Sequence, residues 1–346
     1  MDFKSLLILV LVMLAALYTG VDGAYKYINY KFPVLYTEIN DNLTGNLTAV
    51  APIISMPENS EPKENASETV SSGETAPVMG NETAVGKITD RFISPYGANT
   101  SYNNVFLKNN TGLTIDLPSL LKQRLNFKVE KNSSPQVLIV HTHATESYMT
   151  QDRDYYTESD FSRRLDTNQN MVHIGEIFAE KLQNAGIDVI HDKTLHDHPS
   201  YTGSYTRSAE TVNKHLSENP SIKIVIDIHR DAITSEDKTK TRPVLQFGGE
   251  NTAQVMLVMG SETGGITNFP KWKENLAFAV KYQQTLEVMY PGIARAITLN
   301  SAKYNQNLTV GSILLEVGSE ANTFSEAESA AEKSATALVG LLNTLK

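Results

Sequence analysis

From about Thr114 to the C-terminus, hydrophobic positions follow two alternating patterns. Short apolar runs, such as residues 137–140 and 222–228, are rich in β-branched side chains and have the length of buried strands. Between them, residues 170–185 carry apolar side chains at helical spacing, and Gly186 is well placed as the C-terminal stop. This alternation predicts an α/β fold, with a mixed, mostly parallel sheet and helices on both faces.

The same patterns predict the remaining elements. Further strands are expected at residues 187–190, 244–247, 253–259 and 294–299. Helices are expected at residues 207–218 and 272–289. The last helix opens with a capping box formed by Thr323 and Glu326 and runs an Ala/Leu face to the C-terminus.

An apolar segment near the N-terminus predicts a membrane address. Residues 6–17 are apolar and follow Lys4, and the run extends to about residue 21, near the lower limit for spanning a bilayer. The residues before Ala24 form only a poor cleavage site, which favours residues 1–24 as an uncleaved signal anchor over a cleaved signal peptide. We therefore expect a single-pass protein of the cell membrane with its bulk outside the cytoplasm.

Residues 25–111 are predicted to be an extracytoplasmic linker, mostly disordered. From about residue 57 until Phe92 the chain is rich in Ser, Thr, Glu, Asn and Pro and holds few aliphatic or aromatic side chains. Such a segment cannot bury enough apolar surface to offset the entropy lost on ordering. The folded domain is therefore expected at residues 112–346.

Composition excludes several classes of protein. The chain has no cysteine, so disulfides, thiolate metal ligands and a cysteine nucleophile are absent, and any zinc must be held by nitrogen and oxygen. The formal net charge of −9, without Lys/Arg clusters, argues against nucleic acid as a partner. No G-x-S-x-G motif occurs, and the glycines at residues 80–87 have the wrong spacing for a P-loop, which disfavours a serine hydrolase and a nucleotide-binding enzyme.

Histidine and glutamate side chains follow the ends of three apolar runs. These residues are His141, His143, Glu146, His229 and Glu316. Successive strand residues point to opposite faces, so His141 and His143 are expected to project the same way. Ligands of open α/β sheets collect beyond the carboxyl ends of the strands, which is where all five residues are expected. The group predicts a metal site of the zinc hydrolase type.

Each residue of this group also has a plain structural explanation. A lone histidine at a strand end is more often a hydrogen-bonded polar residue than a ligand. Glu316 alone fits a helix cap or a pair with Arg230 as well as it fits catalysis. Convergence of several such residues at strand ends is what favours the metal site.

Four ordered blocks resemble a known family. They are HTHATESY at 141–148, HDKTLHDHPSYTGSYTRS at 191–208, IDIHRDA at 226–232, and YNQNL followed by LLEVGSEANT at 304–323. Together they look like the stage II sporulation protein P family over about residues 112–346, which would then be the catalytic domain. That family is similar in architecture to the zinc-dependent N-acetylmuramoyl-L-alanine amidases. The resemblance implies a peptidoglycan hydrolase that thins septal cell wall during engulfment, by amidase and endopeptidase cleavage, with the stage II sporulation proteins D and M as partners.

The expected ligand set departs from the broader amidase group in one position. There the second zinc ligand is a Glu at the start of the helix after the first strand, whereas residues 168–170 hold none, and the nearest acids are Asp166 and Glu176. The carboxylate ligand is therefore assigned to Glu146. The same alignment favours His143 as the primary ligand, and leaves His141 as an alternative ligand or as a group that orients the site.

The resulting expectation is a Zn²⁺ ion held by His143, Glu146 and His229, with Glu316 as the general base. The bond expected to be cleaved joins the lactyl group of N-acetylmuramic acid to L-alanine. Three further residues are candidates for substrate binding, with a structural loop role or an ion pair as the alternative: His196, Asp197 and Arg230. Two other functions stay open, a membrane-tethered peptidoglycan-binding protein with a degenerate site and a zinc carboxypeptidase-like peptidase.

Overall fold

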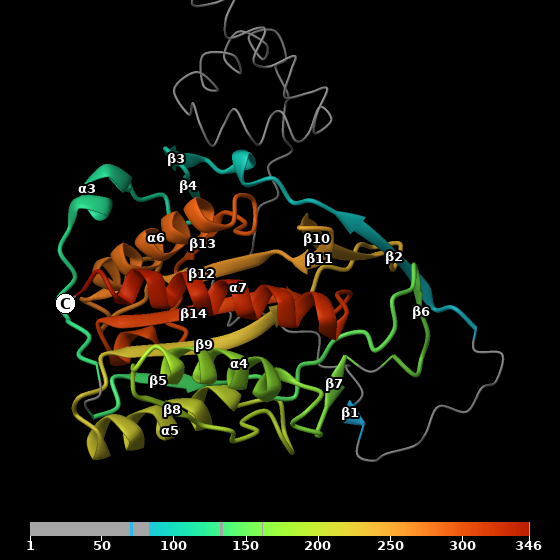
Figure 1. Ribbon diagram of the computed structural model, residues 1–346, viewed down its shortest axis with the longest axis horizontal. Helices are drawn as coiled ribbons and strands as arrows, with labels where there is room; N and C mark the ends of the chain where they lie inside the picture. The colour runs from blue at the N-terminus through green and yellow to red at the C-terminus, as the bar shows by residue number, and fades with distance from the viewer. Residues whose placement is uncertain (1–69, 72–82, 132–133, 161, 346) are drawn as a thin grey trace, which may run out of the picture. The chain divides into compact units, whose positions relative to one another are not determined.

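The computed structural model describes residues 70–71, 83–131, 134–160 and 162–345 (Figure 1). The predicted signal anchor at residues 1–24 and most of the predicted linker lie outside this part of the chain. Within the described residues, no helix is both long enough and apolar enough to cross a bilayer.

An eight-stranded sheet forms the centre of the fold. Its strands, in spatial order, are β3 (Thr100–Tyr102), β4 (Val105–Asn109), β13 (Ile297–Asn300), β12 (Val255–Gly260), β14 (Gly311–Ser319), β9 (Ile224–Asp231), β5 (Val137–Val140) and β8 (Val189–His191). The α/β class and the mixed character of the sheet are confirmed.

The sheet consists of two parallel blocks that run in opposite directions. Strands β14, β9, β5 and β8 are parallel to one another, as are β12, β13 and β4. The blocks meet at the antiparallel pair β12–β14, and β3 is antiparallel to β4. The expectation of a mostly parallel sheet is corrected to a mixed one. The reason is the connection: after β9 the chain passes through two further strands and no crossover helix, so β12 enters the sheet in the opposite direction.

Helices cover both faces of the sheet, as predicted. On β5, Leu138 and Val140 pack with Val212 of α5 (Ser204–Glu218). The alternate residues Val137 and Ile139 belong to the main core, which includes residues of the other long helices. These are α4 (Met171–Asn184), α6 (Trp272–Met289) and α7 (Phe324–Leu342). The short helix α3 (Leu117–Lys122) also contributes residues to this core. The two-residue period of a strand thus separates the two cores.

Helix ends follow the expected chemistry. The Asn170 side chain caps α4 by accepting from the Val172 N–H, and Gly186 takes a left-handed φ of 76° just past its end. The capping box of Thr323 and Glu326 at the start of α7 is present. Helix α5 begins at Ser204, earlier than the predicted residue 207, because the polar Ser-Tyr-Thr start gives no hydrophobic period.

Some residues predicted as linker form strands: β2 of a second sheet, and β3 and β4 of the main sheet. The second sheet has four strands, in the order β11 (Glu250–Ala253), β10 (Lys240–Phe247), β2 (Gly86–Arg91) and β6 (Tyr155–Tyr156). Strand β1 (Val70–Ser71) also pairs with β7 (Arg163–Arg164). The folded part therefore begins before residue 112. Only three consecutive apolar residues, at positions 105–107, mark β4 in the sequence, and their burial depends on β13 from the far end of the chain.

Candidate active site

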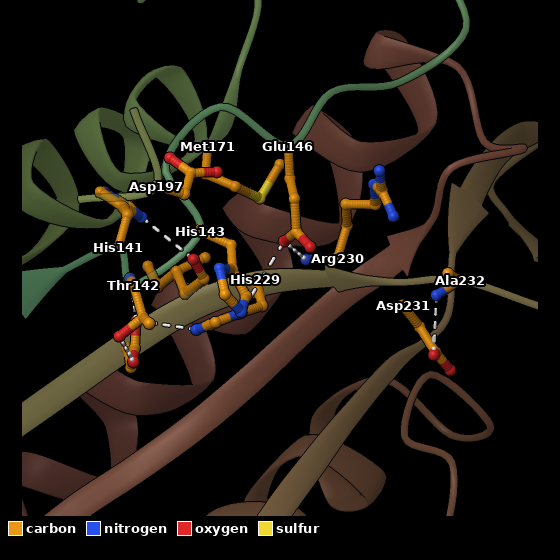
Figure 2. Close-up of polar contacts among 12 residues, drawn as sticks. His141, Thr142, His143, Glu146, Met171, Asp197, His229, Arg230, Asp231 and Ala232 are labelled. Atoms are coloured by element: carbon orange, nitrogen blue, oxygen red, sulfur yellow. Dashed lines mark hydrogen bonds and ion pairs between the residues drawn. The ribbon is translucent and has the colours of Figure 1, made fainter. Parts of the chain in front are cut away.

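Two of the predicted site residues lie on adjacent strands. His229 of β9 and Glu316 of β14 are paired in register across the parallel ladder. Both strands continue beyond these residues, to Asp231 and Ser319, so neither residue ends its strand as expected. His143 and Glu146 lie in the turn that follows β5, and Figure 2 shows them beside His229.

The structure brings His143, Glu146 and His229 together in the interior. Their exposed fractions are 3%, 6% and 3%. The rings of His143 and His229 are 5.1 Å apart and nearly perpendicular, at 87°. The Oε2 atom of Glu146 lies 3.7 Å from Nδ1 of His229 and accepts a hydrogen bond from the Arg230 backbone N–H (Figure 2).

The residue types of His143, Glu146 and His229 suit a zinc ion, but only Glu146 and His229 lie at a spacing close to that of zinc ligands. Two imidazoles and one carboxylate suit zinc, and ligand atoms on a tetrahedral zinc lie about 3.3 Å apart, close to the 3.7 Å between Glu146 Oε2 and His229 Nδ1. His143 instead has Nε2 3.1 Å from the Tyr201 hydroxyl and Nδ1 3.3 Å from Ser204 Oγ. Across the described ranges, no group of three or more His, Asp or Glu side chains is already arranged to hold a metal ion.

Negative charge surrounds His229. Burial alone would lower the pKa of His229, but the carboxylates of Asp227, Glu146 and Glu316 raise it to about 10. The pKa of Glu316 is raised to about 8 by burial and by the charges of Asp231 and Glu146, while His229 acts in the opposite direction. The Glu316 side chain is partly accessible, yet its Oε2 atom is buried without a hydrogen-bond partner. The site therefore favours binding of a proton or another cation.

His141 belongs to a different group of side chains. It is fully buried, its Nδ1–H donates to the Ile228 carbonyl at 3.1 Å, and its Nε2 lies 2.9 Å from Nε2 of His191. Burial and His191 lower the pKa of His141 to about 3, so the ring is neutral. A Cβ atom at Gly175 of α4 would lie 2.5 Å from the Nε2 atom of His141 and 2.5 Å from that of His191. The expectation that His141 and His143 present their rings to one site is not met.

Asp197 is enclosed by the protein and is not placed to contact a substrate. Its carboxylate accepts from the Thr145 N–H at 3.1 Å and from the Thr145 hydroxyl at 2.6 Å. It also pairs with the Arg163 guanidinium at 2.7 Å. These contacts tie the turn that carries His143 and Glu146 to the segment before α5.

His196 and Arg230 have similar internal roles. The Nδ1–H of His196 donates to the His141 carbonyl at 2.8 Å, and its Nε2 lies 2.9 Å from Thr211 Oγ1. The buried Arg230 guanidinium donates to the carbonyls of Ser147 and Ser162 at 3.2 and 2.8 Å. In the structure these residues hold the loops of the site, and their role in substrate binding stays a prediction.

Asp227 and Arg163 were missed by sequence reasoning. Asp227 lies 2.9 Å from His229 Nε2. Arg163 lies over the Tyr201 ring, which also stacks on His143 with 14° between the ring planes. A signal for Asp227 exists in the sequence, because residues i and i+2 of a strand point to the same face. No local signal marks Arg163, which reaches the site from a two-residue strand.

Solved structures resemble the fold loosely. N-acetylmuramoyl-L-alanine amidase AmiC2 of Nostoc punctiforme aligns with a TM-score of 0.35 and 12% identity, covering 60% of this chain and 96% of that one. The CwlD amidase from Clostridioides difficile, solved in complex with the GerS lipoprotein, aligns with a TM-score of 0.38 and 12% identity, covering 62% and 98%. Likeness at this level carries no argument about activity.

Sequence comparison is more specific. The chain is 31% identical over 210 residues to Stage II sporulation protein P of Bacillus subtilis (strain 168). That match covers 58% of this chain and 49% of the relative, so the chain spans about half the length of the curated relative it matches. The model of the Stage II sporulation protein P (SpoIIP) family matches residues 25–339, which is most of the chain. The chain therefore belongs to the stage II sporulation protein P family.

Proposed function

We propose that this protein is a peptidoglycan hydrolase of sporulation that cleaves the amide between N-acetylmuramic acid and L-alanine. The observation that carries the proposal is the buried grouping of His143, Glu146 and His229 beside the unpaired Glu316 oxygen, in a chain of this family. Action on septal wall, a membrane anchor, cleavage of stem-peptide cross-links, and association with the stage II sporulation proteins D and M are parts of the same proposal.

Glu316 is the residue suited to proton transfer. A pKa raised to about 8 lies close to physiological pH, where a group both accepts and donates protons efficiently. Additional positive charge nearby lowers this pKa and favours the carboxylate, which takes a proton from water. The same side chain then delivers the proton to the leaving amine of L-alanine. His229 lies next to Glu316 across the ladder, and its charge favours the ionised form of this carboxylate.

His143, Glu146 and His229 are the residues that would hold a zinc ion. When bound, zinc polarises a carbonyl and lowers the pKa of water toward 7. Binding through His143 requires its ring to exchange the Tyr201 and Ser204 contacts for the ion.

A wall-binding protein without turnover is a second candidate, because no three His, Asp or Glu side chains of the described residues are arranged as a metal site. Purified sacculi incubated with the full-length chain and zinc, followed by mass spectrometry of the released products, separate the two. Released stem peptides with a free α-amino group on L-alanine support the amidase. Cleavage within the stem peptides would show endopeptidase activity as well. Sacculi that sediment the protein but release nothing favour wall binding alone.

A further inference from the structure

A directed chain of hydrogen bonds crosses the interior next to the site. The Asn305 amide donates to Ser208 Oγ at 2.9 Å, the Ser208 and Thr142 hydroxyls are 2.7 Å apart, and the Thr142 hydroxyl donates to Asp227 Oδ2 at 2.6 Å. Thr142, Ser208 and Asp227 are 0%, 1% and 5% exposed. These residues come from four separate segments of the chain, so the chain of bonds exists only in the folded protein.

Chemistry fixes the direction of these bonds. An amide NH₂ only donates and an ionised carboxylate only accepts. Since the Thr142 proton is used on Asp227, the short contact between the two hydroxyls needs the Ser208 proton. Ser208 Oγ also lies 3.5 Å from the Tyr205 carbonyl, a much longer contact. All protons therefore point toward Asp227, and bonds to an ionised group are the stronger ones.

The other Asp227 oxygen faces the site. Oδ1 accepts from the Thr142 N–H at 2.8 Å and lies 2.9 Å from His229 Nε2. The contact with Nε2 has the length of a hydrogen bond but lies off the direction of the ring N–H, so it acts electrostatically in this conformation. A carboxylate beside Nε2 keeps a proton on that nitrogen, while Nδ1 faces Glu146, 3.7 Å away.

The far end of the chain of bonds lies in a strained turn. Tyr304 and Asn305 have φ angles of 50° and 55°, a region that side chains other than glycine adopt at a cost of about 1–3 kcal/mol each. Surrounding bonds hold the turn: the Asn305 amide also donates to the Tyr205 carbonyl at 2.8 Å, and Gln306 bonds both ways with β12. These bonds offset the strain and keep the Asn305 amide in place as the first donor.

We infer that Asp227 is a positioning residue that orients the His229 ring, and that Thr142 and Ser208 hold Asp227 in place. The inference deepens the proposed function and, where it concerns turnover, rests on it. A histidine that binds a metal or a reacting group commonly needs such a carboxylate on its second nitrogen, and loss of that partner costs about 10- to 100-fold in metal affinity or activity.

The orientation is tested without any reaction. Nitrogen-15 spectra of the histidine rings are recorded on the metal-free full-length chain, with His229 identified from the spectrum of His229→Ala. The parent should show a protonated Nε2, and Asp227→Asn, which removes the carboxylate charge beside this nitrogen, should move its signal away from the parent position. Thr142→Val, which keeps the carboxylate, should move it in the same direction by less. A His229 Nε2 signal unchanged in Asp227→Asn overturns the inference.

Turnover provides the second readout, on soluble peptidoglycan fragments. Thr142→Val should lower kcat by about 10- to 100-fold with KM unchanged, and Thr142→Ser, which keeps the hydroxyl, should restore most of it. Thr252→Val is the matched control. Thr252 is equally buried, and its hydroxyl lies 2.8 Å from the Ser329 hydroxyl, outside the site. Equal loss in the Val and Ser variants, or in the control, contradicts positioning by this hydroxyl. An inactive parent overturns the proposed function, and the ring spectra still decide the role of Asp227.

Discussion

Two pairs of buried histidines next to this sheet differ in what surrounds them. In the pair His141–His191 every ring nitrogen has a hydrogen-bonding partner: the Ile228 carbonyl, the other ring, or Glu176. In the pair His143–His229, the buried Nε2 of His229 has no hydrogen bond. A pair of histidines alone therefore does not identify a functional site, whereas an unsatisfied buried nitrogen is unusual enough to need an explanation.

Charge separates the pairs further. His141 and His229 are both fully buried, yet the pKa of His141 is lowered to about 3 and that of His229 is raised to about 10. Burial lowers both values. The carboxylates of Asp227, Glu146 and Glu316 reverse the direction only at His229. The first pair joins α4 to the sheet, and the second lies where the protein concentrates negative charge.

The largest effect is expected at the carboxylate beside the second pair. Glu316→Gln keeps the shape and removes the proton acceptor, so the rate of peptide release should fall by about 10²- to 10⁴-fold. Measured zinc content should stay at the parent value. Loss of the metal would instead make Glu316 a ligand, and near-normal release would exclude it as the base.

Metal content contrasts the two pairs directly. Elemental analysis of the zinc-incubated chain should find close to one zinc, and His229→Ala should lose it, because it removes a ligand. His191→Ala, in the first pair, should retain the metal. A metal-replete His229→Ala protein would contradict the assignment. Full zinc affinity in Glu146→Ala would place the carboxylate ligand elsewhere.

The buried carboxylate of Glu287 gives the stability of the fold a pH dependence. Glu287 accepts from the Gly292 and Ala294 N–H groups, and burial raises its pKa to about 7 from 4.5. The folded state thus holds this proton more tightly than the unfolded state. Stability from Glu287 is present below pH 4.5 and is lost as pH rises to about 7, by up to about 3 kcal/mol.

Urea unfolding between pH 5 and pH 8 measures this effect of Glu287. The free energy of unfolding of the parent should fall with pH relative to Glu287→Gln, while peptide release by the variant stays at the parent rate. A pH-independent difference would show that Glu287 titrates alike in both states.

The smallest effect is expected in the packing of the first pair. Gly175→Ala places a Cβ atom 2.5 Å from the Nε2 atoms of His141 and His191, so it should destabilise the fold by about 1–3 kcal/mol. Gly340→Ala in α7 is the matched control. Its Cβ would meet nothing closer than 3.5 Å, so it should stabilise by about 0.5–1 kcal/mol. Equal thermal midpoints for the two variants would show that the histidine pair yields to the extra methyl group.

Local patterns in the sequence determined most of the elements. Helix α6 spans residues 272–289 as predicted, α4 begins within one residue of its predicted start, and α7 begins at the predicted cap. Helical spacing and capping residues act over a few neighbouring positions, which is why the sequence shows them. The gathering of His143, Glu146, His229 and Glu316 also follows from short-range information, since each lies on or just after a strand of one parallel block.

Contacts between distant segments decided the rest. The opposite direction of β12, the inclusion of β3 and β4, the separation of His141 from His143, and the burial of Asp197 under Arg163 each depend on partners far away in the sequence. The hydropathy pattern predicts which residues are buried, but not which hydrogen-bond donor or acceptor contacts each of them in the folded protein. For this protein, the sequence determined which side chains could form a site, and only the tertiary structure decided which histidine had partners for both ring nitrogens and which kept a buried nitrogen without a hydrogen bond.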